Sequence, residues 1–301
     1  MRPCAAKVCI AAHFIAEIAL MGQDGTLIDR GTQRWVRATG RLVDFADHPW
    51  LRGPVGDPDV IGDTWVDTEI ERLGGRRREG GGLLASMADL ASDTFDPHGL
   101  GTSVTDFYEQ TSDWRLEVWS QWSLPAWPLG WLLTAAFATR LEQLSLPLRP
   151  LETSRGMDSR VIRVVDDGGR QLGAAWLRTL RSSGRMLYSG WYGTAVMPAT
   201  GRPSVRVAFP LPNGSVTVFL RPEVDDCGGL RLVSPLSTFG DDGAYLIVAR
   251  RDRQAGWVRR VPLAEAFAVY VDEDGVLRAD HALDLGSVPV IRFHYRLDRA
   301  Q

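Results

Sequence analysis

The stretch SVRVAFPLPNGSVTVFL, residues 204–220, decides the fold. Two runs rich in β-branched and aromatic residues, 204–211 and 215–220, flank the dipeptide Asn213-Gly214. Asn-Gly between two such runs is the strongest short signal for a β-hairpin, because a type I′ turn needs positive φ at both central residues. The sequence therefore predicts two antiparallel strands with Asn213 and Gly214 at the centre of a two-residue turn.

Turns of the same kind recur on both sides of this hairpin. Short loops rich in Gly, Asp, Asn and Ser separate runs of alternating character, which predict further strands. Tight turns force antiparallel neighbours, and a sheet of many strands tends to curl or close. We therefore expect an α+β fold in which residues 158–297 form one antiparallel meander, as a curved sheet or a closed barrel. The further strands are expected at 160–165, 171–180, 186–196, 231–234, 244–250, 257–261, 267–271 and 288–297.

The character of the chain changes near Pro147 and Pro150. Before this point helical spacing and loops dominate, and after it short strands dominate. We expect a leader at 1–33, a mainly helical and loop region at 34–150 that packs on the sheet, and the sheet itself at 151–301. Together the three parts are expected to form one cooperative unit.

Two helices of the first half are predicted to cover the sheet, over 104–122 and 128–144. The large apolar residues of the first helix are spaced by seven, four and four, which places them on one face: Phe107, Trp114, Val118 and Trp122. We expect Trp114, Trp122 and Phe137 to be buried against the sheet. A short helix is predicted at 65–73, a solvated arginine-rich loop at 74–82, and a strand or short helix at 34–45.

Two apolar segments raise the question of a membrane. Residues 1–21 have the outline of a signal peptide, but His13 and Glu17 interrupt the apolar run, so a short leader helix is favoured over a secretory signal. A true start at Met21 instead of Met1 is the third interpretation. The uncharged run 118–139 is long enough to span a bilayer, but two prolines and several polar residues divide it. We favour a buried pair of helices there, with a membrane or partner contact through the Trp-rich segment 114–131 as an alternative.

Charge and composition exclude several classes of function. The formal net charge is −3 and the isoelectric point is about 6.0, which gives no basic footprint for nucleic acid. Lys7 is the only lysine, so mechanisms that depend on a lysine are not supported. The three cysteines match no metal or disulfide pattern and fit a reducing cytoplasm. We expect no metal and no cofactor, and the oligomeric state is left open.

The candidate site residues lie mainly in two strands. Tyr188 and Tyr192 share one face of the run 186–196, where they line a ligand cavity or pack as ordinary aromatics. In the last strand His294 lies between Arg292 and Arg296 on the polar face. Like charge would lower the pKa of His294 and make it a neutral base in a wet cavity, although a solvated outer face is favoured. Asp158 completes the catalytic candidates, and Trp114 and Trp122 complete the ligand-binding ones.

Several stretches resemble uncharacterised actinobacterial proteins of about the same length. These stretches are HPWLRGP (48–54), DFYE (106–109), WRLEVWSQW (114–122), GMDSR (156–160) and FPLPNGS (209–215). The resemblance covers most of the chain after residue 35 and implies a cytoplasmic bacterial protein with no stated activity. At the level of fold alone, the expected sheet is similar to lipocalin-like or START-like ligand carriers and polyketide cyclases. A START-like chain ends in a long helix, whereas this chain ends in a strand.

Three functions remain open at this point. The first is non-catalytic binding of an apolar or aromatic small molecule or lipid in a cavity of the sheet, capped by Trp-rich helices. The second is acid–base catalysis by a cyclase or isomerase that uses His294 and Tyr188. The third is docking on a partner or a membrane through segment 114–131. The absence of a trusted catalytic motif favours the first.

Overall fold

The computed structural model describes residues 28–56, 62–122, 156–181, 184 and 186–300. In these ranges the chain forms one antiparallel sheet of fourteen strands together with three α-helices. The helices are α2 (Ile28–Thr39), α3 (Thr64–Leu73) and α4 (Thr102–Glu109). The strands are β1 (Arg41–Asp44), β2 (Arg76–Glu79), β3 (Trp114–Trp122), β4 (Met157–Val165), β5 (Gln171–Leu180), β6 (Met186–Val196), β7 (Pro203–Leu211), β8 (Gly214–Val224), β9 (Leu230–Ser234), β10 (Gly243–Ala249), β11 (Ala255–Val261), β12 (Leu263–Val271), β13 (Leu277–Leu285) and β14 (Val288–Arg299).

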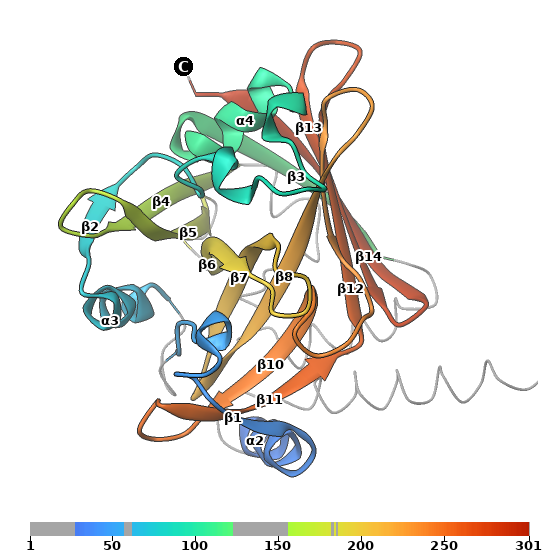
Figure 1. Cartoon of the computed structure of the whole chain (residues 1–301). Helices are drawn as coiled ribbons and strands as arrows, with labels where there is room; N and C mark the ends of the chain where they lie inside the picture. The colour runs from blue at the N-terminus through green and yellow to red at the C-terminus, as the bar shows by residue number, and fades with distance from the viewer. Residues whose placement is uncertain (1–27, 57–61, 123–155, 182–183, 185, 301) are drawn as a thin grey trace, which may run out of the picture.

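The sheet is a curled meander with one branch. The main path runs β2-β4-β5-β6-β7-β8-β9-β12-β13-β14-β3, and β10, β11 and β1 branch from β8. The end strands β2 and β3 do not pair with each other in the described chain, so the sheet is curved and does not close into a barrel. The expected antiparallel meander is therefore confirmed, in its curved form (Figure 1).

The concave face of the sheet holds the largest apolar cluster. Inward-pointing residues of nearly every strand meet side chains from α4 and from the segment before it. Helix α2 lies at the other end of the curl, where Val36 joins the same cluster (Figure 1). On the convex face, α3 covers β4 to β7 with Trp65 and Val66, and Trp50 and Leu51 cover β8 and β10.

The central hairpin forms one residue earlier than expected. Leu211 pairs with Gly214, and Val207 pairs with Val218, so Pro212 and Asn213 are the two turn residues. Asn213 has φ of +59°, and proline fixes its own φ near −65°. Proline followed by a residue with positive φ is the pattern of a type II turn, not of type I′. The proline before Asn-Gly thus moves the turn by one position.

The expected helix over 104–122 is wrong in its second half. Helix α4 ends at Glu109, the Thr111 hydroxyl donates to the Phe107 carbonyl oxygen at 2.6 Å, and β3 begins at Trp114. The sequence of β3 satisfies a period of two as well as the helical spacing, because Trp114, Leu116 and Val118 alternate with polar or exposed residues. Pairing with β14 along its whole length decides between the two.

Smaller differences concern polar strands. Residues 76–79, expected as part of a loop, form the exposed edge strand β2, and β13 was not expected at all. The run 34–45 contains the end of a helix and then a strand. Polar strands show little alternation of apolar and polar residues, so a search for that alternation does not detect them.

The Trp-rich segment is described only as far as residue 122. Trp114 is buried, with 6% of its surface exposed, as expected. The side chain of Trp122, Phe137 and the expected helix over 128–144 lie outside the described residues. Among the helices within the described ranges, none combines the length and the apolar character needed to cross a membrane.

Two tryptophans on β3 offer a matched test of this packing. Trp114 contacts Phe107 with ring centres 6.0 Å apart, whereas Trp119 is 49% exposed on the other face. We expect Trp114→Ala to lower the free energy of unfolding by about 3–5 kcal/mol and Trp119→Ala to change it by about 0.5 kcal/mol or less. Urea unfolding of both variants checks this, and equal losses would contradict the strand assignment of 114–122.

Candidate functional site

Three strands bring a group of polar side chains to the concave face. Arg178 of β5 pairs in register with Tyr188 of β6, and Tyr192 lies four residues further on the same face. Tyr295 reaches the same region from β14, since the Arg178 guanidinium carbon lies 5.8 Å from its ring centre. Residues separated by more than a hundred positions in the sequence therefore meet inside the curl.

Gly190 explains how Tyr188 and Tyr192 come together. A Cβ atom at Gly190 would lie 3.0–3.2 Å from the Tyr188 ring and its hydroxyl, closer than ordinary van der Waals contact, so the ring would have to shift. The absence of this atom lets the Tyr188 ring lean along the strand, and its hydroxyl donates to the Tyr192 hydroxyl at 2.8 Å. The strand glycine thus serves a close approach of an aromatic ring.

Arg178 is a buried cation without a counter-ion among the described residues. Only 8% of its surface is exposed, and its Nε has no hydrogen-bond partner. The guanidinium carbon lies 4.3 Å from the Trp176 ring centre and 4.2 Å from that of Tyr188. Aromatic faces stabilise a cation, but they do not replace the hydrogen bonds lost with water.

A second polar pair lies across the interior on β12 and β13. His281 Nε2 and Glu265 Oε2 are 3.2 Å apart, and both side chains are largely buried. The His281 ring stacks between Phe267 and Phe293, with ring centres 3.8 Å and 5.3 Å away. Glu265 shares one face of β12 with Phe267 and Val269, and Val269 belongs to the concave cluster, so Glu265 lies on the same side of the sheet as that cluster.

Burial keeps the phenols of this group neutral. Removal from water raises the pKa of Tyr192 to about 12, although the hydrogen bond from Tyr188 and the charge of Arg178 oppose the shift. Burial also raises the pKa of Tyr188 and of Tyr108 well above the ordinary value. At neutral pH these groups are therefore hydrogen-bonding hydroxyls and not bases.

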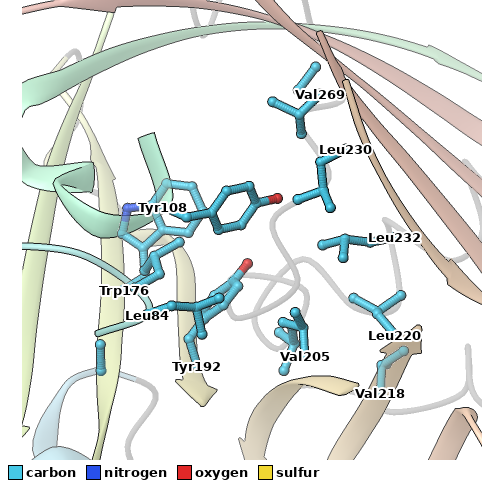
Figure 2. Close-up of a cluster of buried hydrophobic side chains, with 14 of the residues drawn as sticks. Leu84, Tyr108, Trp176, Tyr192, Val205, Val218, Leu220, Leu230, Leu232 and Val269 are labelled. Atoms are coloured by element: carbon cyan, nitrogen blue, oxygen red, sulfur yellow. The ribbon is translucent and has the colours of Figure 1, made fainter. Parts of the chain in front are cut away.

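The polar group faces an aliphatic wall. Figure 2 shows Trp176, Tyr108 and Tyr192 on one side and branched aliphatic side chains on the other. The hydroxyls of Tyr108 and Tyr192 are directed toward the same part of the interior. The opposite side consists of Val205, Val218, Leu220, Leu230, Leu232 and Val269.

His294 and Asp158 lie on the convex face and do not meet Tyr188. His294 Nδ1 is 2.6 Å from Asp280 Oδ1, and Asp158 pairs with Arg181 at 2.7 Å. Because His294 and Tyr295 are neighbours in one strand, they point to opposite sides of the sheet. Arg292, His294 and Arg296 therefore point to the outer face of the sheet. There Arg292 forms an ion pair with the carboxylate of Asp284 at 2.8 Å.

A groove of about 700 Å³ crosses this outer face beside Trp119. Alanines of β12 and β13 form its floor, and longer side chains form its sides. The His294–Asp280 pair lies within it, and the groove is also lined by Phe267, His281 and Phe293, so it borders the second polar pair. The floor and sides include Ala266, Ala268, Ala282, Trp119, Gln121, Arg231 and Arg292.

The tryptophans proposed as ligand contacts have different positions. Trp114 packs on Phe107 and donates from Nε1 to Asp106 at 3.2 Å, so it anchors α4 to the sheet. It reaches the interior group only through Phe107, whose ring centre lies 6.3 Å from that of Trp176. The side chain of Trp122 lies outside the described residues.

Sequence reasoning missed Arg178, Glu265 and His281. A signal for Arg178 was present, since alternation places it on the face of Trp176, where an arginine is unexpected. His281 lies in a strand that was not predicted, and the proximity of Glu265 depends on the curl of the sheet.

Comparison with known proteins gives one distant similarity. The chain is 28% identical over 223 residues to the "Uncharacterized membrane protein YndJ" of Bacillus subtilis (strain 168). The aligned part is 72% of this chain and 38% of that protein, so the chain spans well under half of the relative's length. No protein-family model and no solved structure matches the chain. The similarity assigns no activity, and the expected analogy to lipocalin-like or START-like carriers finds no support in this comparison.

Alkaline titration tests the burial of the tyrosines. The pKa of Tyr192 is raised above its unfolded value, so above a pH of about 10 the unfolded state loses its proton first, and stability falls as pH rises toward about 12. Below a pH of about 10 Tyr192 contributes no pH dependence of this kind. Urea unfolding across this range should show a shallower decline for Tyr192→Phe. A phenolate absorbance with an ordinary midpoint in native protein would contradict the burial.

Proposed function

We propose that the chain binds an apolar or aromatic small molecule or lipid on the concave face of its sheet, without chemical conversion. The observation that carries the proposal is the Tyr188–Tyr192 hydroxyl pair opposite an aliphatic wall. Ligand sites are typically apolar surfaces with a few convergent polar groups. The neutral phenols orient a ligand by hydrogen bonds, and the wall supplies apolar contact.

Binding to a neutral aromatic probe tests this function. We expect 1-pyrenebutanol to bind the full chain, and the double variant Tyr188→Phe/Tyr192→Phe to weaken binding about fivefold or more, because each hydroxyl contributes about 1 kcal/mol. Fluorescence titration measures the affinity, and native mass spectrometry of the purified protein looks for a bound compound lost on denaturation.

Tyr270→Phe provides the matched control. Tyr270 lies on the outer face of β12, where its hydroxyl donates to Asp280 at 3.0 Å, so its loss should leave probe binding unchanged. Absence of both probe binding and a co-purified compound would refute the proposed function. Equal weakening by the control variant would place the probe elsewhere.

Acid–base catalysis is the second candidate function, and the Glu265–His281 pair is the observation that favours it. A carboxylate that holds an imidazole in one orientation is a recurrent catalytic arrangement. In this version His281 takes the role first considered for His294, and Tyr192 and Tyr295 are the nearby hydroxyl groups. If the wild-type protein converts a bound compound and the His281→Gln variant binds it without converting it, this function is favoured over simple binding.

Contact with a membrane or partner is the third candidate. Trp119 is 49% exposed beside the outer groove, within the Trp-rich segment considered above. The relative in Bacillus subtilis is described as a membrane protein, although the aligned part covers 38% of it. A cytoplasmic location, suggested by the cysteine usage, is compatible with such a contact at the inner membrane surface. Vesicle binding that is lost in Trp119→Ala would favour this function.

A further inference from the structure

The buried guanidinium of Arg178 calls for an acceptor that the described chain does not supply. An arginine stays charged at all physiological pH values, so burial without an anion is unfavourable. Glu69 gives the contrast: it is 2% exposed and accepts two hydrogen bonds from Arg72 at 2.5 Å and 2.7 Å, whereas the Nε atoms of Arg52 and Arg206, like that of Arg178, are buried without a partner in the described chain. Arg178 has aromatic rings around it instead, and its Nε donates to nothing.

The contacts of Arg178 leave its Nε without an acceptor among the described residues. Two rings lie close to the guanidinium group, those of Trp176 and Tyr188. The N–H groups project from the edge of the guanidinium in a fork that matches a carboxylate. The aromatic contacts and a hydrogen bond with Tyr295 thus hold the fork in place while its Nε–H remains without an acceptor in the described chain.

Tyr192 adds a second donor without an acceptor. Its hydroxyl accepts the hydrogen bond from Tyr188, so its own hydrogen is available, and no acceptor for it is present in the described part of the chain. Arg178 and Tyr192 share Trp176 as a neighbour, whose ring centre lies 4.3 Å from the guanidinium carbon and 5.6 Å from the Tyr192 ring centre. The Tyr192 hydroxyl points into the interior toward the side of Tyr108 (Figure 2). A charged donor and a neutral donor converge on one face.

We propose that the ligand of the concave face carries a carboxylate, which Arg178 and Tyr192 bind, and an apolar or aromatic body, which the aliphatic wall contacts. This inference rests on the proposed binding function and names its ligand class. A single negative charge fits better than the double charge of a phosphate monoester, because Glu265 already places a negative charge near Tyr192. Arg178 is then a specificity-determining residue, and its cost in the free protein is offset when the ligand binds.

Matched probes that differ only in the acid group test the inference. We expect wild-type protein to bind 1-pyrenebutyrate at least about tenfold more tightly than 1-pyrenebutanol, since a hydrogen bond to a charged group is the stronger kind. Arg178→Gln should abolish this preference while it leaves affinity for the alcohol unchanged. Arg178→Lys keeps the charge but not the fork, so it should retain part of the preference.

The controls separate the possible failures. Arg181→Gln removes an exposed arginine three residues away that pairs with Asp158, and it should leave the preference intact. Urea unfolding shows whether each Arg178 variant is folded, and Arg178→Lys serves as the readout if the Gln variant is not. Equal binding of acid and alcohol by wild-type protein overturns the carboxylate proposal and leaves the binding function standing. Tighter binding of dodecyl phosphate than of dodecanoate overturns it as well, and binding of none of these probes refutes the binding function itself.

Discussion

The change of partner along β8 is the constraint on which the rest of the structure depends. Its first six residues pair with β10, and the residues from Arg221 onward pair with β9. One strand thus begins two branches of the sheet, one through β10, β11 and β1 and the other through β9, β12, β13, β14 and β3. Both branches leave β8 at the edge opposite β7, so the sheet divides there, and both contribute residues to the apolar cluster of the concave face.

The concave space contains polar groups that an apolar core does not need. A core that served stability alone would have an aliphatic residue at Arg178, since replacing a buried charge by a packed apolar side chain is often neutral or favourable. The Tyr188–Tyr192 hydrogen bond and the Glu265–His281 pair lie in the same interior. Their presence beside an aliphatic wall is the feature on which the proposed binding function rests.

Much of the fold was predictable because its second half obeys local rules. Strand β6 begins and ends where alternation and turn residues place it, and β5 does likewise. A helix was expected at β3 because its tryptophan and valine residues fit the helical spacing as well as the two-residue alternation of a strand. Pairing with the edge of β14 makes this segment a strand. At the hairpin, the local chemistry of Pro212 shifted the turn in a way that the Asn-Gly signal alone does not reveal. Local rules thus predicted elements well and failed where a distant strand or a neighbouring proline made the choice.

The site was less predictable than the fold for the same physical reason. Tyr188 and Tyr192 share a strand, so alternation alone places them together. Arg178 meets Tyr295, and Glu265 lies near Tyr192, only because the sheet curls between β5 and β14.

This dependence links function to stability. A buried cation held without an anion lowers the stability of the free protein, and any ligand that binds only the folded chain restores stability by mass action, by about 2.7 kcal/mol at a hundredfold excess over its dissociation constant. If the proposed ligand binds there, the same groups that hold it make the ligand-free protein less stable than its apolar core alone would allow.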